Sequence, residues 1–373
     1  MAGIYIHIPF CKQACHYCDF HFSTSLNKRD AMLGAICKEL ILRKEELTQP
    51  IETIYFGGGT PSLLTPQEID FVLQTVYDNF TIVDTPEITL EANPDDLTDA
   101  KITALASSKI NRLSIGIQSF FEEDLKLMNR AHNQTEALDC IVKAKQYFKN
   151  ISIDLMYGIP QMSPQRWQEN IEKALSLEVP HISCYVLTVE PKTALERFIK
   201  NGIIRPVDDA VAARHHAVLV EKTAAVGYHN YEFSNFCIPG WESQSNSSYW
   251  MRKPYLGVGP SAHSYDVVSR SWNVSNNPRY IKSIEKGVLP LTTEILTTEN
   301  QYNEYIMTRL RTAGGVSIDE IGAFFGLKFQ EYLKQNMQQH IALGLLICEE
   351  DVIKATKKGK FLTDGIAADL FMI

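Results

Sequence analysis

The chain has 373 residues, of which 45% are hydrophobic and 21% are charged, the ordinary mixture of a folded globular protein. This length predicts two domains, or three. The formal net charge of −8 argues against a general nucleic-acid or membrane-surface binder, and no apolar run reaches the length of a membrane span. The first ten residues lack the basic start and small-residue cleavage site of a signal peptide, so we expect a cytoplasmic protein with reduced thiols.

Six short runs rich in β-branched and aromatic residues alternate with longer segments of helical spacing in the first half of the chain. The predicted strands cover 3–8, 52–56, 87–91, 112–117, 151–157 and 181–186. The predicted helices cover 29–47, 67–79, 99–108, 134–148 and 165–177. Strands that alternate with helices pair in parallel through right-handed crossovers. The pattern therefore predicts an α/β fold, a partial (β/α)6 TIM-like barrel, with a doubly wound sheet as the alternative.

Chemically unusual residues follow the ends of these predicted strands. Three cysteines follow the first strand, the run GGGTPS at 57–62 follows the second, and Glu91 closes the third. Gln118 closes the fourth strand, Asp154 lies on the fifth, and Thr188 follows the sixth. Because the active site of such a barrel lies at the C-terminal ends of its strands, all six strand ends point to one site. Turn composition alone accounts for the glycines, but not for the thiols.

The alternation of strands and helices ends near residue 190. Residues 191–297 are rich in aromatic, serine and asparagine side chains, and we interpret them as a segment packed on the barrel of residues 1–190. Residues 298–373 predict three helices and then two short strands around the sequence KATKKGK, which is a winged-helix-like outline. Acidic residues flank this short basic stretch, so we expect no binding of nucleic acid.

Cys11, Cys15 and Cys18 form a C-x3-C-x2-C motif directly after the first predicted strand. Thiolates bind soft metals and iron–sulfur clusters. A structural zinc site normally closes four ligands, and nearby histidines keep zinc open as an alternative. Three thiolates on a 4Fe–4S cluster leave one iron without a protein ligand, and an open metal position of this kind can hold a substrate. We therefore expect a 4Fe–4S cluster on these three cysteines.

The residues around the cysteines resemble the motifs of radical S-adenosylmethionine (SAM) proteins, which combine this cysteine loop with a GGGTP turn. Six longer stretches occur in order over nearly the whole chain: YIHIPFC, FGGGTPS, EANPDD, RLSIGIQSF, DLMYGIP and GKFLTDGIAADL. Together they resemble the oxygen-independent coproporphyrinogen III oxidase family, and most closely its heme-chaperone branch. The resemblance implies that the amino and carboxylate groups of SAM chelate the open iron.

The resemblance also assigns site residues. The positions that it implies for SAM binding are Tyr5, Gly58, Thr60, Glu91, Gln118, Arg130, Asp154 and Thr188. Glu91 would suit the ammonium or ribose hydroxyls of SAM, and Arg130 would suit its carboxylate. The glycines at 57–59 would let the backbone approach the ligand closely. The partners implied are heme as cargo, heme-acceptor proteins, and an electron donor such as a flavodoxin or ferredoxin.

Two departures from the family motifs distinguish the branches. The oxidases continue the cluster motif to a further cysteine, and Phe20 stands at that position here. The heme chaperones carry an H-N-x-x-Y-W signature, of which this chain retains Asn246, Tyr249 and Trp250, with Ser245 in place of the histidine. Serine is a poor heme ligand, so another side chain is needed to bind the iron axially. The candidates are His215, His216, His229, His263 and Cys237.

We therefore predict a heme chaperone that binds heme and delivers it to acceptor proteins, with a 4Fe–4S cluster and SAM. The alternative is an enzyme that decarboxylates coproporphyrinogen III oxidatively to protoporphyrinogen IX with SAM as co-substrate. A radical SAM enzyme that acts on an unrelated substrate is a further class. A radical SAM core allows cleavage of SAM, but the residue at position 20 argues against coproporphyrinogen turnover.

Overall fold

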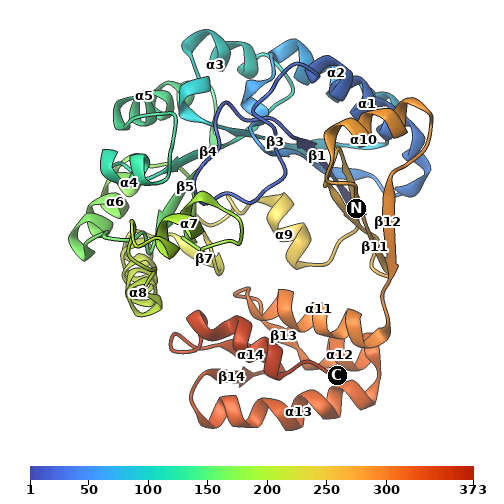
Figure 1. Cartoon of the computed structure of the whole chain (residues 1–373). Helices are drawn as coiled ribbons and strands as arrows, with labels where there is room; N and C mark the ends of the chain where they lie inside the picture. Colours follow the sequence, from blue (N-terminus) through green and yellow to red (C-terminus); the bar gives the residue numbers. More distant parts are fainter.

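A computed structural model describes all 373 residues of the chain. One 12-stranded sheet curves into an open barrel, and a smaller three-stranded sheet belongs to a C-terminal domain (Figure 1). The strand order of the large sheet is β12-β11-β10-β9-β1-β2-β3-β4-β5-β6-β8-β7. No helix is both long and apolar enough to cross a bilayer.

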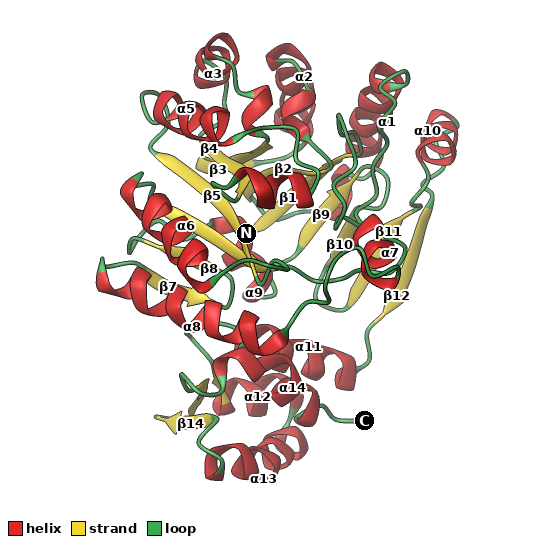
Figure 2. Ribbon diagram, turned by 60° about the vertical axis from the view of Figure 1, so that its left-hand side comes forward, coloured by secondary structure: helices red, strands yellow, loops and turns green.

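Six central strands pair in parallel, as the sequence pattern predicts. They are β1 (Ala2–Ile8), β2 (Ile51–Gly58), β3 (Ile82–Ala92), β4 (Arg112–Gln118), β5 (Asn150–Tyr157) and β6 (His181–Val186). The helices between them are α1 (Arg29–Leu42), α2 (Pro66–Asn79), α3 (Asp99–Ala106), α4 (Glu122–Leu127), α5 (Gln134–Ala144) and α6 (Pro164–Ser176). All six lie on the convex face of the sheet, so the partial barrel is confirmed and the doubly wound alternative is wrong (Figures 1 and 2). The short helix α4 was not predicted.

Local signals begin the outer helices where the sequence predicts them. Thr65 caps α2 in a reciprocal capping box with Glu68, and Pro66 occupies the first turn. Ser163 accepts a hydrogen bond from the backbone N–H of Arg166 at the start of α6. The helices turn an apolar stripe toward the strands. In α2 this stripe consists of Ile69, Val72, Leu73 and Val76.

Residues 191–297 extend the sheet at both of its edges. β7 (His229–Glu232) and β8 (Asn235–Cys237) add antiparallel strands beside β6. β9 (Tyr255–Val258) pairs in parallel with β1, and the chain continues outward through β10 (His263–Tyr265), β11 (Ser269–Asn273) and β12 (Leu291–Ile295). The helices of this segment are α7 (Ala194–Lys200), α8 (Asp209–Ala225), α9 (Gln244–Trp250) and α10 (Asn277–Glu285).

The segment that we expected to pack on the barrel thus continues the barrel sheet, because its short strands pair the backbone groups that the edge strands β1 and β6 would otherwise expose. Only α9 lies within the curve of the sheet (Figure 1). The strands of this segment have three to five residues and mixed polarity, so the sequence carried no clear alternation there. The division of the chain at residues 190 and 297 stays a prediction.

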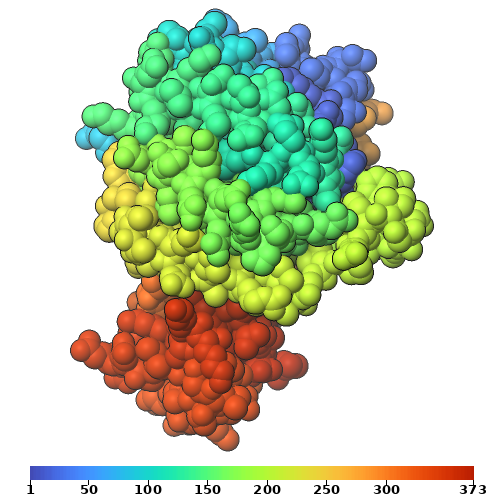
Figure 3. Space-filling view, turned by 90° about the vertical axis from the view of Figure 1, so that its left-hand side faces the viewer, coloured from blue at the N-terminus to red at the C-terminus, as the bar shows by residue number.

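The C-terminal domain has its own core of 16 buried residues and forms a separate lobe in the space-filling view (Figure 3). Its elements are α11 (Thr298–Leu310), β13 (Val316–Ser317), α12 (Ile318–Phe325), α13 (Leu327–Ala342), β14 (Leu346–Glu349), β15 (Val352–Ala355) and α14 (Thr363–Asp369). The predicted strands around KATKKGK are misplaced, because the hairpin turns earlier, at Glu350 and Asp351. Both residues have positive φ, 47° and 60°, as a two-residue hairpin turn requires.

The C-terminal domain closes the open side of the barrel. At one edge of the large sheet, the backbone N–H of Ala313 donates to the Tyr231 carbonyl at 2.9 Å. At the other edge, Arg270 of β11 pairs with Glu304 of α11 at 3.1 Å. The domain therefore contacts both edges, and α11 lies across the gap between them (Figure 1).

A fully buried carboxylate joins the added strands to α1. Glu39 accepts hydrogen bonds from Arg43 Nη1 at 3.0 Å and from Asn273 Nδ2 at 2.7 Å. It also accepts from the Gly259 backbone N–H at 2.9 Å and from the Tyr280 hydroxyl at 2.6 Å. Four donors satisfy both oxygens, which is the condition under which a buried charge is tolerated.

We predict that Glu39→Ala lowers the free energy of unfolding by about 3–5 kcal/mol, because it leaves the buried Arg43 charge without its buried partner. Glu46→Ala is the matched control, since Glu46 also pairs with Arg43 but is 44% exposed, and its loss should cost at most about 1 kcal/mol. Urea unfolding followed by circular dichroism measures both. Equal losses in the two variants would contradict a special role for Glu39.

Candidate functional site

The three-cysteine motif lies in the loop between β1 and α1, at the C-terminal end of the barrel strands. Contacts on two sides hold this loop. Lys12 Nζ pairs with Asp95 Oδ2 at 2.7 Å and also with Asp96, both in the turn after β3. On the other side, His16 Nδ1 donates to the Leu127 carbonyl at 2.8 Å, at the end of α4. These contacts position the cysteine loop through the protein's own side chains.

The three thiols are half-buried, and neighbouring residues donate hydrogen bonds to two of them. Thr60 Oγ1 donates to Cys11 Sγ at 3.3 Å. Arg130 Nη1 donates to Cys15 Sγ at 3.6 Å. Such donors stabilise negative charge on sulfur. Burial raises the pKa of Cys11 to about 11 and that of Cys18 to about 12, so these thiols keep their protons at neutral pH until a metal displaces them.

This set of donors fits an iron–sulfur cluster better than it fits zinc. No three His, Cys, Asp or Glu side chains converge as the ligands of a single metal ion would. The ligands of a 4Fe–4S cluster each bind a different iron, so they need not converge on one point. Three half-buried thiols with no fourth in the loop match a cluster that keeps one iron open.

The glycine run after β2 is required by the packing of the protein itself. Gly58 has a φ of +106°, and a Cβ atom there would lie 2.5 Å from the imidazole ring of His7. A Cβ atom at Gly59 would lie 2.6 Å from the Phe10 carbonyl oxygen. The sequence suggested close approach to a ligand, and the structure adds close approach between β1 and β2 as a second reason for glycine.

Two carboxylates lie inside the barrel near the strand ends. Glu91 accepts hydrogen bonds from the Tyr55 hydroxyl at 2.8 Å and from the Gly58 backbone N–H at 3.2 Å. Burial raises the pKa of Glu91 to about 7, a value that includes the opposing effect of the Tyr55 hydrogen bond and the smaller upward effect of the Asp154 carboxylate. Burial also raises the pKa of Asp154 to about 6, although Arg112 opposes the shift. A bound cation would lower both pKa values and favour the charged forms.

Arg130 lies between the cysteine loop and the ends of β3 and β4. Its Nη2 donates to Asn93 Oδ1 at 2.6 Å and to the Gly116 carbonyl at 2.8 Å, and its Nε is buried with no partner. The Gln118 amide lies beside it, since a Cβ atom at Gly116 would meet Gln118 Nε2 at 2.9 Å and Arg130 Nη2 at 3.2 Å. Asn93 was not among the predicted site residues, although it lies in the EANPDD stretch.

The structure thus places most of the residues assigned to SAM around the C-terminal ends of the strands. Tyr5 stacks on Tyr55 with ring centroids 6.1 Å apart, and Tyr55 in turn binds Glu91. Thr188 is the exception, since it is exposed in the loop after β6 and makes no side-chain hydrogen bond. The assignment of the eight residues to SAM stays a prediction.

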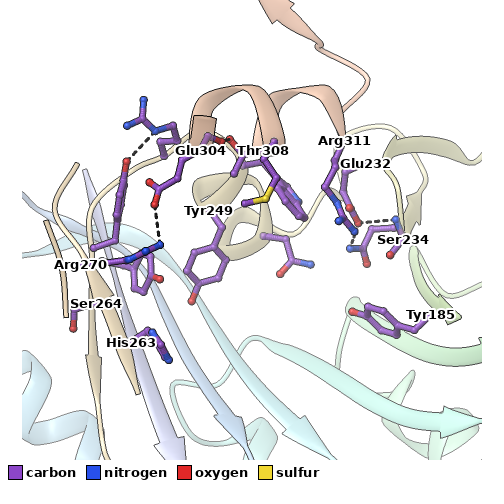
Figure 4. Close-up of a pocket in the computed structure, with 17 residues that line it drawn as sticks. Tyr185, Glu232, Ser234, Tyr249, His263, Ser264, Arg270, Glu304, Thr308 and Arg311 are labelled. Atoms are coloured by element: carbon purple, nitrogen blue, oxygen red, sulfur yellow. Dashed lines mark hydrogen bonds and ion pairs between the residues drawn. The ribbon is translucent and has the colours of Figure 1, made fainter. Parts of the chain in front are cut away.

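A cavity of about 610 Å³ lies between α9, the two edges of the large sheet and α11 (Figure 4). We call it the α9–α11 pocket. Its lining includes Tyr185, Asn246, Tyr249, Trp250, His263 and Arg311. The structure therefore brings the three residues of the predicted heme motif to one pocket and adds aromatic side chains from the sheet.

The first turn of α9 is fixed by a buried acid. The backbone N–H groups of Gln244 and Ser245 donate to the two Glu87 carboxylate oxygens, each at 3.1 Å. Ser245 lies in the first turn of α9, is buried, and is not part of the lining of the α9–α11 pocket. The Ser245 side chain is therefore not available to a ligand in this pocket.

Among the five alternative iron ligands, only His263 lines the pocket. His215, His216 and Cys237 are buried in the core, and His229 is exposed on β7.

Several polar atoms in the lining are buried and have no hydrogen-bond partner. The donors are Trp250 Nε1, Arg252 Nη2 and Arg311 Nε. Arg270 also lines the pocket, but Glu294 and Glu304 already pair with it at 2.8 and 3.1 Å. The arginines come from different parts of the chain, so no local sequence signal could have grouped them.

Comparison with known proteins agrees with this architecture. The family model of the radical SAM superfamily matches residues 5–174, and that of the HemN C-terminal domain matches residues 296–362. The chain is 34% identical to the heme chaperone HemW of Bacillus subtilis over 98% of both chains, and 32% identical to that of Lactococcus lactis over 97% of both. The solved structure of the coproporphyrinogen III oxidase HemN from Escherichia coli, a radical SAM enzyme, has a TM-score of 0.84 and 22% identity. That likeness covers all of this chain and 90% of the other, and it shows the fold.

The partial barrel, the cysteine loop and the first family match define a radical SAM protein. The full-length relatives go further, and the chain belongs to the HemW family within that superfamily. The predicted resemblance to the heme-chaperone branch is confirmed.

We predict that changing Cys11, Cys15 or Cys18 to Ala abolishes cluster assembly, because a thiolate ligand of one iron is lost. Anaerobic reconstitution of the wild-type protein should yield about four irons and four sulfides per chain. Cys348→Ala is the control, since this thiol is exposed outside the loop and its variant should reconstitute fully. Stoichiometric zinc without sulfide in the wild-type protein would contradict the assignment.

We predict that the affinity for SAM falls about tenfold as the pH drops from about 8 to about 6. A cationic ligand prefers the ionised carboxylate, and Glu91 takes up a proton as the pH falls through about 7. Glu91→Gln should remove most of this dependence, which separates it from titration of the ligand's own amine at about pH 8. Equilibrium dialysis under anaerobic conditions measures the binding, with the exposed Glu178→Gln as control. An unchanged pH profile in Glu91→Gln would contradict the role.

Proposed function

We propose that this protein is a heme chaperone that holds heme in the α9–α11 pocket and carries a 4Fe–4S cluster and SAM at the strand ends of its barrel. The observation that carries the proposal is the pocket itself, which gathers the Asn246, Tyr249 and Trp250 motif residues beside arginine side chains. Membership of the HemW family supports it, because the relatives with this architecture are named heme chaperones.

The lining of the pocket suits a porphyrin. Tyr249 comes from α9 and Tyr185 from β6, and their rings lie on different sides of the cavity (Figure 4). Trp250 also lines the pocket, so aromatic side chains are available for a flat apolar macrocycle. Arg252 and Arg311 also line the pocket, and their guanidinium groups would suit the propionate carboxylates of heme.

The residues at the strand ends suit the other two cofactors. Glu91 and Asp154 would hold the cationic groups of SAM, and Arg130 would pair with its carboxylate or with the thiolate sulfur that it already contacts. When bound, the cluster would supply the electron for reductive chemistry on SAM. An electron donor such as a flavodoxin or ferredoxin, and heme-acceptor proteins, complete the proposal as partners, with the cytoplasm as the site of action.

The alternative activity, coproporphyrinogen decarboxylation, has less support. Phe20 is 68% exposed and stands where the oxidases carry a cysteine, and an aromatic ring can act neither as a metal ligand nor as a nucleophile. The likeness to the solved oxidase is a likeness of fold at 22% identity.

We predict that the reconstituted protein binds about one heme per chain but converts no coproporphyrinogen III. The test incubates the protein with SAM, a reductant and coproporphyrinogen III and follows decarboxylated product, while a separate titration follows the Soret band of heme. Tyr249→Ala and Trp250→Ala should each weaken heme binding by about 1–2 kcal/mol, because each removes an aromatic face.

The control is Tyr147→Ala, which changes an exposed tyrosine outside the pocket and should leave heme affinity unchanged. Multiple turnovers to protoporphyrinogen IX would overturn the chaperone proposal. Unchanged heme affinity in both aromatic variants would place heme elsewhere in the protein.

A further inference from the structure

The α9–α11 pocket contains a histidine that is suited to bind the iron of the cargo. Resting on the proposed heme-binding function, we propose that His263 of β10 is the axial ligand of heme iron in this protein. Ser245 cannot bind the heme iron in this way, because its side chain has no nitrogen ligand and does not line the pocket.

The hydrogen bonds of the ten histidines separate His263 from the others. Eight have a ring nitrogen within hydrogen-bond distance of a protein partner, namely His7, His16, His21, His132, His181, His215, His216 and His340. His229 and His263 have none, and of these two only His263 lines the pocket. Its imidazole is therefore free to bind a ligand without breaking a contact within the protein.

The strand pairing holds His263 in place. It lies opposite Trp272 in the antiparallel β10–β11 pair, and the two rings stack with centroids 5.9 Å apart and planes inclined at 27°. Its backbone passes close to β9, since a Cβ atom at Gly257 would lie 1.9 Å from the His263 carbonyl oxygen. A ring supported on one face by an indole and anchored on a paired strand is preorganised for coordination.

The protonation of His263 also suits a metal ligand. Burial and the neighbouring Arg270 lower the pKa of the imidazole below its usual value, so the neutral form prevails at pH 7. Iron binds the neutral imidazole, and no proton has to be displaced.

Other side chains of the pocket are less suited to this role. Tyr249 could ligate iron only as a phenolate, and burial raises its pKa far above the physiological range. Met307 of α11 offers only a thioether, a soft ligand that suits ferric iron less well than an imidazole does. Tyr249 thus serves as a stacking face, whereas His263 supplies the nitrogen.

The test titrates ferric heme into the full-length protein and records the Soret and visible bands together with the iron spin state by EPR. His263→Ala should lose the wild-type spectrum and bind heme more than about tenfold more weakly, since loss of even a ligand's supporting partner costs that much. Added imidazole should restore the wild-type bands in this variant by entering the space that the side chain leaves. His263→Gln, which keeps the size of the side chain, should show the same spectral loss and guards against misfolding of the alanine variant.

His229→Ala is the matched control, because His229 is the other histidine with no hydrogen-bond partner, and its variant should keep the wild-type spectrum. Wild-type bands in both His263 variants would overturn the assignment while the heme-binding function stands. The same loss of bands in His229→Ala or Met307→Leu would overturn it as well. If the wild-type protein bound no heme, the proposed function itself would fail, and this inference with it.

Discussion

The large sheet runs through 12 strands without pairing its first strand to its last, and the gap between β7 and β12 governs how the rest of the chain is arranged. The C-terminal domain fills that gap through the backbone contact of Ala313 with Tyr231 at one edge and the Arg270–Glu304 ion pair at the other. The α9–α11 pocket exists because both edges and α11 bound it. A closed barrel of the same strands would have no lateral opening of this kind.

The two proposed sites share one barrel interior, and aromatic side chains lie between them. Tyr249 contributes to the α9–α11 pocket and, together with Tyr55, also lines a small neighbouring cavity. The hydroxyl of Tyr55 donates a hydrogen bond to Glu91. Tyr185 lines the same pocket, and burial together with the Asp154 carboxylate raises its pKa. A cargo in the pocket would therefore lie close to the carboxylates that we assign to SAM.

Buried polar groups in this protein fall into two kinds, those with hydrogen-bond partners and those without. Glu39 is surrounded by four donors, so its charge stabilises the junction of α1 with the added strands. Around the α9–α11 pocket, Trp250, Arg252 and Arg311 keep buried donors without acceptors. These donors lack the partners that Glu39 has, and leaving them unpaired is unfavourable for folding.

Local patterns were enough to predict the six strand–helix units, the cysteine loop and the family, because periodicity and motif spacing are properties of neighbouring residues. Local patterns could not predict that residues 191–297 add strands at both edges of the sheet, because strands of three to five residues take their position from distant partners. Local patterns also could not select His263 from the five candidate iron ligands, and they could not group Arg252 with Arg311 in one pocket. Which way a side chain points, and what lies opposite it, depends on contacts between residues far apart in the chain.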